Sequence, residues 1–515
     1  MKRFAPRALV FALVLAIVAP VFAAQSAARP VPAAAADEPK LLAAMHTITD
    51  AKLFDYVKEL CSTKYAGRLT GTPEFTAAAE WVASLLKSWG VQPGGDKGTF
   101  LQAFPNPYSL VFKGGLLAMN IPVGKDVIKK SYAYEDEFIP GGTTAGGEVT
   151  AEVIFVGYGI TAPELGYDDY AGVDVRGKIV LMDPEVPLGA SDTDPAFKKW
   201  RPYSFHQYKL ENAVAHGAKA MIYNYGPIGN PNNSYREGFI YHHVGAAVVA
   251  DVFAGTGRTY AATMEKIRAG LKPQSFATGK IMTVKNVAER HPEGMGYNVV
   301  GFVPGTDPKL KDEVVIFGGH LDHLGMLWEM MPGANDNATA VAVGLGVAEA
   351  MAKCEVKPKR SVLFLFFGSE EQGVAGSDFY CEHPLFPLDK TLVFINMEGP
   401  GIGDRIGASG STTYPAFWAF IEKANKDYVH RPLSGGPASY PGRPRQDSAR
   451  FFWKGVPSLT FGASGKPLPY STYHLPKDRP ELVTPEIMTD TAKLFFMAVM
   501  DICGQPGPLN FRPAK

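Results

Sequence analysis

The run Ser361–Phe367, which reads Ser-Val-Leu-Phe-Leu-Phe-Phe, limits the fold of this 515-residue chain more than any other segment. Because it is apolar at nearly every position, it predicts a strand buried on both faces. Further strands are expected at 297–303, 314–317, 391–395 and 459–461, and helices at 338–353 and 485–502. Buried strands alternating with helices indicate an α/β protein with a mixed, mostly parallel central sheet flanked by helices.

Side chains able to bind metal follow these strands or lie in turns. In chain order they occupy His320-Leu321-Asp322, Asn335-Asp336-Asn337, Glu370-Glu371, Asn396-Met397-Glu398 and Tyr473-His474. Ligands of open α/β sheets gather beyond the carboxyl ends of the strands, so we expect these segments to converge there. Two imidazoles and five carboxylates suit zinc, and two zinc ions can polarise a carbonyl and activate a bridging water. The inventory therefore favours a two-zinc hydrolase.

The positions of the carboxylates suggest separate roles for them. Asp336 lies in the turn before the expected helix 338–353, and we interpret it as the carboxylate that both metals share. Asp322 could accept the second N–H of His320 and fix the tautomer of that imidazole. Neighbouring side chains diverge, so one of Glu370 and Glu371 can bind metal while the other holds a proton near the water. Each residue alone has an ordinary structural explanation, and only their joint order carries the hypothesis.

At these residues the chain resembles the M28 family of zinc peptidases. The similar segments are Gly319-His320-Leu321-Asp322, Gly333-Ala334-Asn335-Asp336-Asn337, Phe367-Gly368-Ser369-Glu370-Glu371-Gln372-Gly373, Gly376-Ser377, Tyr473-His474-Leu475-Pro476-Lys477-Asp478 and, near the start, Gly67-Arg68-Leu69-Thr70-Gly71-Thr72. The resemblance covers nearly all of the mature chain, and it implies the zinc-peptidase fold.

The resemblance also implies a role for each residue of the site. His320 and Glu398 would hold one metal, Glu371 and His474 would hold the other, and Asp336 would bridge the two. Glu370 would be the general base, and the hydroxyl of Tyr473 would stabilise the oxyanion. Two positions depart from the family pattern. Glu398 stands where aspartate is usual, and Gln446-Asp447-Ser448 replaces the usual Ser-Asp-His.

The texture of the chain changes near residue 146, where short β-rich runs begin to alternate with Gly- and Pro-rich turns. The resemblance implies that this stretch is an inserted protease-associated (PA) domain. We expect a signal peptide at 1–24, a disordered leader at 25–39, and the peptidase domain in two parts, 40–145 and 287–515. The PA-like insert would occupy 146–286 between those parts.

The first residues are typical of a secretory signal, because Lys2, Arg3 and Arg7 precede the apolar run Ala8–Val18 and the break at Pro20. We expect a secreted or periplasmic protein, with an uncleaved membrane anchor as the alternative. No later run is long enough to span a bilayer. The four cysteines, Cys61, Cys354, Cys381 and Cys503, could form two disulfides or remain buried thiols.

The expected function is that of an exported di-zinc peptidase that acts on peptide substrates, most simply as an aminopeptidase. A glutaminyl cyclase-like enzyme with one zinc and a non-catalytic receptor or binding protein of the same fold are the alternatives. The 51 basic and 51 acidic residues balance, so nothing favours nucleic acid as a partner. Neither a G-x-S-x-G elbow nor an H-E-x-x-H helix occurs in the sequence. The sequence leaves open the oligomeric state and the choice between aminopeptidase, carboxypeptidase and dipeptidase.

Overall fold

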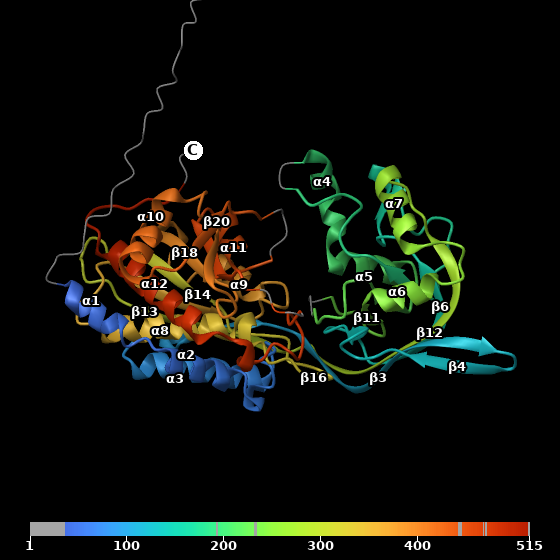
Figure 1. Ribbon diagram of the computed structural model, residues 1–515, viewed down its shortest axis with the longest axis horizontal. Helices are drawn as coiled ribbons and strands as arrows, with labels where there is room; N and C mark the ends of the chain where they lie inside the picture. Colours follow the sequence, from blue (N-terminus) through green and yellow to red (C-terminus); the bar gives the residue numbers. More distant parts are fainter. Residues whose placement is uncertain are drawn as a thin grey trace, which may run out of the picture.

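The computed structural model describes residues 37–191, 194–230, 234–440, 445–466, 468 and 471–512. Two lobes lie side by side, one around a nine-stranded sheet and one around a ten-stranded sheet (Figure 1). The predicted signal peptide and most of the predicted leader fall outside the described residues. Within the described ranges, no helix is both long enough and apolar enough to cross a bilayer.

Four parallel strands form the centre of the nine-stranded sheet, in the order β17 (Ser361–Phe367), β14 (Val314–His320), β18 (Thr391–Met397) and β21 (Ser458–Ser464). Antiparallel strands β13 (Met295–Val303) and β19 (Arg405–Ser409) extend it on the two sides. The outer strands are β1 (Gln92–Pro93), β2 (Leu101–Pro105) and β20 (Leu433–Gly436). The sheet is therefore mixed, with the predicted parallel arrangement at its centre.

Helices cover both faces of this sheet, which explains why its central strands are apolar throughout. Phe364 and Phe366 pack into the cluster formed by α1 (Glu38–Met45), α2 (Asp50–Leu60), α3 (Pro73–Ser88), α8 (Thr339–Lys353), α10 (Pro415–Ala424) and α12 (Pro485–Gly504). Leu363 and Leu365 point the other way and pack with residues of α9 (Ala375–Glu382) and α11 (Ser448–Trp453). Alternate side chains of a strand face opposite sides, so both must be apolar here.

The ten-stranded sheet runs in the order β16-β15-β3-β12-β6-β9-β10-β11-β5, and β4 pairs with β3. Its strands are β3 (Tyr108–Val123), β4 (Asp126–Ser131), β5 (Phe138–Pro140), β6 (Gly147–Phe155), β9 (Ile179–Met182), β10 (Ala220–Tyr223), β11 (Ile240–Val244), β12 (Phe276–His291), β15 (Met326–Leu327) and β16 (Glu329–Met330). A small hairpin of β7 (Thr161–Ala162) and β8 (Tyr167–Asp168) and helices α4 (Pro195–Trp200), α5 (His206–Ala215), α6 (Ala246–Phe253) and α7 (Tyr260–Gly270) complete the lobe.

This second lobe begins earlier than the texture of the sequence suggested. Its strand β3 starts at Tyr108, whereas the insert was expected to start at residue 146. The two 16-residue strands β3 and β12 pair along most of their length, so the first belongs with the lobe that the second closes. Much of β3 and all of β4 are exposed or partly exposed, which leaves them without a strong apolar signature.

The cysteines settle one alternative that the sequence left open. All four are free and buried, so the prediction of buried thiols is confirmed for this structure.

Candidate metal centre

The ends of three neighbouring parallel strands supply most of the candidate site. His320 is the last residue of β14, and Glu398 directly follows β18. Glu370 and Glu371 come shortly after the end of β17, which pairs with β14. The structure thus brings these residues together at the carboxyl edge of the sheet, as the topology of parallel strands requires.

Asp336 lies between the two imidazoles of the site. Its Oδ1 is 3.2 Å from Nε2 of His320, and its Oδ2 is 3.2 Å from Nε2 of His474. Asp336 belongs to the turn Ala334–Ala338 that leads into α8, and its own backbone is not helical, with φ −113° and ψ 88°. The carboxylate of Asp478 holds this turn, because it accepts hydrogen bonds from the backbone N–H groups of Asn335 and Asp336, at 2.9 Å each. Each oxygen of Asp336 therefore faces a different imidazole.

Glu398 completes a first group around His320. Its Oε2 is 3.3 Å from Nε2 of His320, and the three ligand atoms of His320, Asp336 and Glu398 lie within 4.8 Å of one another. The side-chain amides of Asn337 and Asn396 donate to the two oxygens of Glu398, at 3.1 and 3.0 Å. The longer side chain at position 398 thus reaches the imidazole with both of its oxygens held.

Glu371 and His474 form a second group with Asp336. Oε2 of Glu371 is 3.1 Å from Nε2 of His474, and its Oε1 is 2.8 Å from Nδ1 of His323. Sequence reasoning missed His323. The signal that could have found it is a second histidine three positions after His320, in the loop that follows β14. His323, Asp336 and Glu371 also form a group that could hold a metal ion, so two histidines border this side of the site.

Asp322 organises the backbone after β17. Its carboxylate accepts the backbone N–H groups of Glu370 and Glu371, at 3.2 and 3.3 Å. Nδ1 of His320 lies 3.1 Å from the backbone carbonyl of Asp322 and 3.5 Å from its carboxylate. The carbonyl is therefore the nearer acceptor for the imidazole N–H, and the carboxylate mainly fixes the two glutamates.

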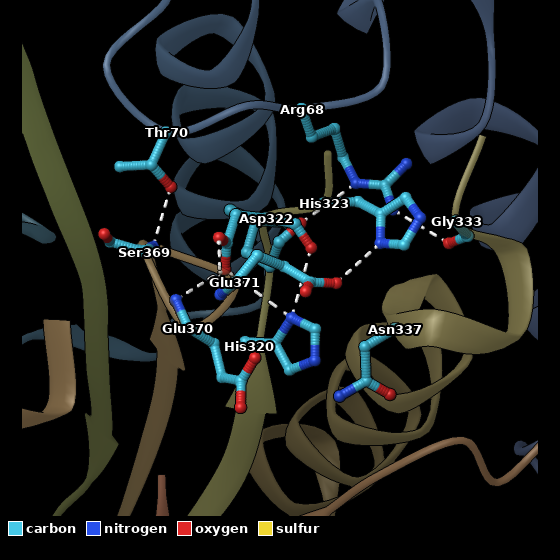
Figure 2. Close-up of polar contacts among 12 residues, drawn as sticks. Arg68, Thr70, His320, Asp322, His323, Gly333, Asn337, Ser369, Glu370 and Glu371 are labelled. Carbon is cyan, nitrogen blue, oxygen red and sulfur yellow. Dashed lines mark hydrogen bonds and ion pairs between the residues drawn. The ribbon is translucent and has the colours of Figure 1, made fainter. Parts of the chain in front are cut away.

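Glu370 lies beside His320 (Figure 2). Its backbone N–H is bound to Asp322, whereas its carboxylate points away from Asp322. Burial raises the pKa of Glu370 well above the usual value, and the carboxylates of Glu398, Glu371 and Asp447 add to this effect, while His320 opposes it. A carboxylate in such surroundings takes up a proton more readily than one on the surface.

Asp447 is a further buried acid at the site. It directly precedes α11 and has no exposed surface, and neither of its oxygens makes a hydrogen bond of good geometry with a described residue, although the side chain of Ser377 lies near enough to lower its pKa. Burial raises the pKa of Asp447 to about 8, and the charge of Glu398 adds to the rise, whereas His320 lowers it.

Tyr473 lies at the open side of the site. Its ring is stacked on the imidazole of His474, with the ring centroids 3.7 Å apart, and 54% of the residue is exposed. Tyr473 thus offers a partly exposed ring and hydroxyl directly beside a candidate ligand.

The segment Gly67–Thr72, which precedes helix α3, is hydrogen-bonded to three of the loops that carry the site. The guanidinium of Arg68 is fully buried and donates to four backbone carbonyls, those of Leu60, Leu321, Pro332 and Gly333. Thr70 accepts the backbone N–H of Ser369 at 2.7 Å (Figure 2). This segment therefore joins the loop of His320, the turn of Asp336 and the loop of Glu370.

The donor set fits divalent metal ions. Carboxylates crowd around the buried imidazoles, and burying so much negative charge is costly unless cations neutralise it. Nε2 of His323 is also buried without a hydrogen-bond partner in the described part of the chain. Imidazole nitrogens and carboxylate oxygens are ligands that zinc accepts readily. The fold and the site together are those expected of a metal-dependent enzyme built on a mixed α/β sheet.

Comparison with known proteins narrows this class. Residues 298–499 match the sequence model described as peptidase family M28. A probable leucine aminopeptidase 2 of Aspergillus oryzae is 34% identical over 180 residues, which are 33% of this chain and only 34% of that protein. An aminopeptidase of Pseudomonas aeruginosa is 25% identical over 442 residues, or 83% of this chain and 72% of that protein. The region that carries the candidate metal ligands therefore matches peptidase family M28, and the longer match is to a protein called an aminopeptidase.

Two solved structures share the fold over most of the chain. An aminopeptidase from Aneurinibacillus sp. strain AM-1 has a TM-score of 0.63 at 22% identity, covering 92% of this chain and 98% of that one. A zinc aminopeptidase from Bacillus subtilis has a TM-score of 0.56 at 17% identity, covering 90% and 98%. Both likenesses extend well beyond the matched family segment, so they confirm the α/β fold with its mixed sheet.

Proposed function

We propose that the chain is a di-zinc aminopeptidase that removes residues from the N-terminus of peptides. One observation carries the proposal: the two oxygens of Asp336 face two different imidazoles at the same distance. A carboxylate in that position can join two metal ions, with His320 and Glu398 on one side and His474 and Glu371 on the other. The relatives that are called aminopeptidases, one of them a zinc enzyme, support the same reading.

Bound zinc ions would supply Lewis acidity for the scissile carbonyl and for a water molecule. The remaining chemistry falls to side chains of this protein. Glu370 has no competing hydrogen bond among the described residues, so it can accept the proton of the attacking water and pass it to the leaving amine. Tyr473 borders the entrance, where its hydroxyl can stabilise the developing oxyanion.

The charges around the site favour a substrate ammonium over a substrate carboxylate. Asp447 is a buried acid without a hydrogen bond of good geometry to the described residues, and it can pair with a free N-terminus. Two nearby arginines within the described residues, which could otherwise bind a carboxylate, are engaged elsewhere. Arg445 pairs with Glu185 at 2.8 Å, and Arg450 pairs with Asp378 at 3.1 Å. These contacts support aminopeptidase rather than carboxypeptidase activity.

The two alternatives have less support from the geometry. A cyclase that uses one zinc needs only one group of ligands, whereas Asp336 is flanked by two. A receptor would have no use for Glu370, whose carboxylate is kept free beside the predicted metal ligands. The exported location remains our proposal from the first 24 residues, whose pattern is typical of a cleaved signal peptide.

Hydrolysis of leucine nitroanilide and of its N-acetyl derivative tests the proposal. The account expects cleavage of the free amine only, loss of activity after treatment with a chelator, and recovery on addition of zinc. Equal cleavage of both substrates would contradict recognition of the N-terminus. Activity that survives complete removal of metal would contradict the metallopeptidase mechanism itself.

A further inference from the structure

The loop between β10 and β11, which belongs to the second lobe, touches the metal-binding edge of the first. The backbone carbonyl of Gly229 lies 2.6 Å from Nδ1 of His474, and the backbone N–H of Gly229 donates to the carbonyl of His474 at 3.0 Å. These reciprocal hydrogen bonds join residues 245 positions apart in the sequence. A residue of the second lobe is thus bonded directly to an imidazole of the candidate metal centre.

We propose that the second lobe positions His474 as a metal ligand through the carbonyl of Gly229. An imidazole whose Nδ1–H is held by a carbonyl presents the lone pair of Nε2 in a fixed direction. In this structure that Nε2 faces Asp336 and Glu371. The inference rests on the proposed function, because it requires His474 to bind a metal.

Residues of both halves of the chain surround Gly229 and the residue before it. Nδ1 of His243, on β11, lies 2.8 Å from the carbonyl of Ile228 and so holds the loop on the side of the second lobe. On the other side, a Cβ atom at position 229 would lie 2.8 Å from a methyl group of Leu324 and 2.8 Å from one of Leu327. Both leucines are buried, so even a methyl group at position 229 must displace them or the loop.

Two further contacts join the second lobe to segments of the first near this point. Lys477, three residues after His474, pairs with Glu135 of the second lobe at 2.9 Å. The hydroxyl of Tyr134 donates to the backbone carbonyl of Leu327. The segment that carries His474 is therefore joined to the second lobe at Gly229 and at Glu135, and we expect a shift of that lobe to move this imidazole.

The other imidazole has no such dependence. Nδ1 of His320 lies 3.1 Å from the carbonyl of Asp322, which belongs to its own loop. Disturbing Gly229 should therefore weaken one metal position and leave the other unchanged. A merely structural role of the loop would instead lower the stability of the protein without distinguishing the two positions.

Zinc titration of the metal-free full-length protein, against a chromophoric chelator that competes for the ion, tests the inference. In Gly229→Ala we expect the affinity for one zinc ion to fall about 10- to 100-fold, which is the usual effect of losing an outer partner of a ligand, while the other ion binds as before. Adding Leu324→Ala removes one of the two close contacts of the new methyl group and should restore part of the lost affinity. The matched control is Gly189→Ala, since that glycine of the second lobe has open space around it.

Each outcome decides a separate point. Unchanged binding of both ions in Gly229→Ala, or equal weakening of both, would overturn the inference while the proposed function stands. A wild-type protein that binds fewer than two zinc ions would overturn the proposed function and the inference with it. If Gly229→Ala fails to fold, His243→Phe provides the second variant. Phenylalanine keeps an aromatic ring at this position but cannot form the hydrogen bond with the carbonyl of Ile228. This variant should weaken the same single ion, and its failure to do so would also overturn the inference.

Discussion

Two adjacent glutamates after β17 have opposite surroundings. Burial opposes the charged form of Glu371, but His474 and His323 outweigh it and lower the pKa of Glu371 to about 2. Burial raises the pKa of Glu370, and only His320 opposes the rise there. Two carboxyl groups whose environments drive their pKa values apart can divide the work of ligand and proton acceptor.

The substitution Glu370→Gln tests this division. Glutamine keeps the shape of the side chain but cannot accept the proton, so kcat should fall by about 100-fold or more. Zinc content should stay at the wild-type level. Assays of turnover and metal content on the same sample check the prediction, and loss of metal together with activity would reassign Glu370 as a ligand.

The substitution Asp447→Asn tests the recognition of the N-terminus. Removing the buried carboxyl group that is proposed to pair with the substrate ammonium should raise KM for leucine nitroanilide about 10- to 100-fold, with a smaller effect on kcat. The preference for the free amine over the N-acetyl substrate should shrink accordingly. An unchanged KM would show that another group binds the ammonium.

The residues with metal-binding chemistry could be found in the sequence, because their order along the chain matches the order of the strands that carry them. His323 and Asp447 were not assigned roles. A lone histidine after an established ligand, or an acid before a short helix, has many structural uses. Only the three-dimensional contact of His323 with Glu371, and the burial of the Asp447 carboxyl group without a hydrogen bond of good geometry in the described part of the chain, distinguish them.

At the scale of elements, the turn before α8 fixes the position of Asp336. Two of its backbone N–H groups depend on the carboxylate of Asp478, which comes from the segment after His474. Burial raises the pKa of Asp478, whereas these two N–H groups stabilise its charged form. The same carboxylate thus joins the turn of Asp336 to the loop of His474.

The substitution Asp478→Ala should leave both N–H groups without an acceptor. We expect a loss of about 2–3 kcal/mol in the free energy of unfolding, since each buried donor without a partner costs about 1–3 kcal/mol. Urea denaturation measures the loss, and zinc affinity should fall with it. Asp478→Asn is the milder control because it retains one acceptor. Equal stability of all three proteins would contradict this role of Asp478.

The elements that the sequence predicted well are those that are buried along nearly their whole length, because burial on all sides requires apolar residues at almost every position. Strand β17 has the predicted bounds, and helix α8 starts within one residue of its prediction. Strands β19 and β20 carried no comparable signal, because both are short and contain glycine. Strand β19 pairs with both β20 and β21, which come later in the chain, so local sequence does not determine the pairing.

At the scale of the whole molecule, the chain passes from the first lobe into the second near Asn106 and returns near Gly294, and these two segments lie side by side. The N–H of Asn106 donates to the carbonyl of Gly294 at 2.7 Å, and β2 pairs with β13 just beyond. The ends of the lobe therefore lie together. Strands β15 and β16 come from the catalytic half and join the sheet of the second lobe, so the two lobes are also linked at its edge.

Replacing residues 107–293 by a short glycine linker should leave a folded peptidase domain with a weakened second metal position. The expected result is zinc binding reduced for one ion and kcat lowered, because His474 loses the carbonyl of Gly229. Circular dichroism checks the fold of this variant before the kinetics are measured. Wild-type kcat in the shortened protein would contradict the coupling between the lobes.

The central claim is a pair of metal ions joined by Asp336, and the zinc content per chain tests it most directly. Elemental analysis of the purified wild-type protein should give about two zinc ions per chain, the number expected for a two-metal hydrolase. In Asp336→Ala, both should be lost, because the shared carboxylate is removed from each position. One zinc ion or none in the wild-type protein, or two in Asp336→Ala, would contradict the account.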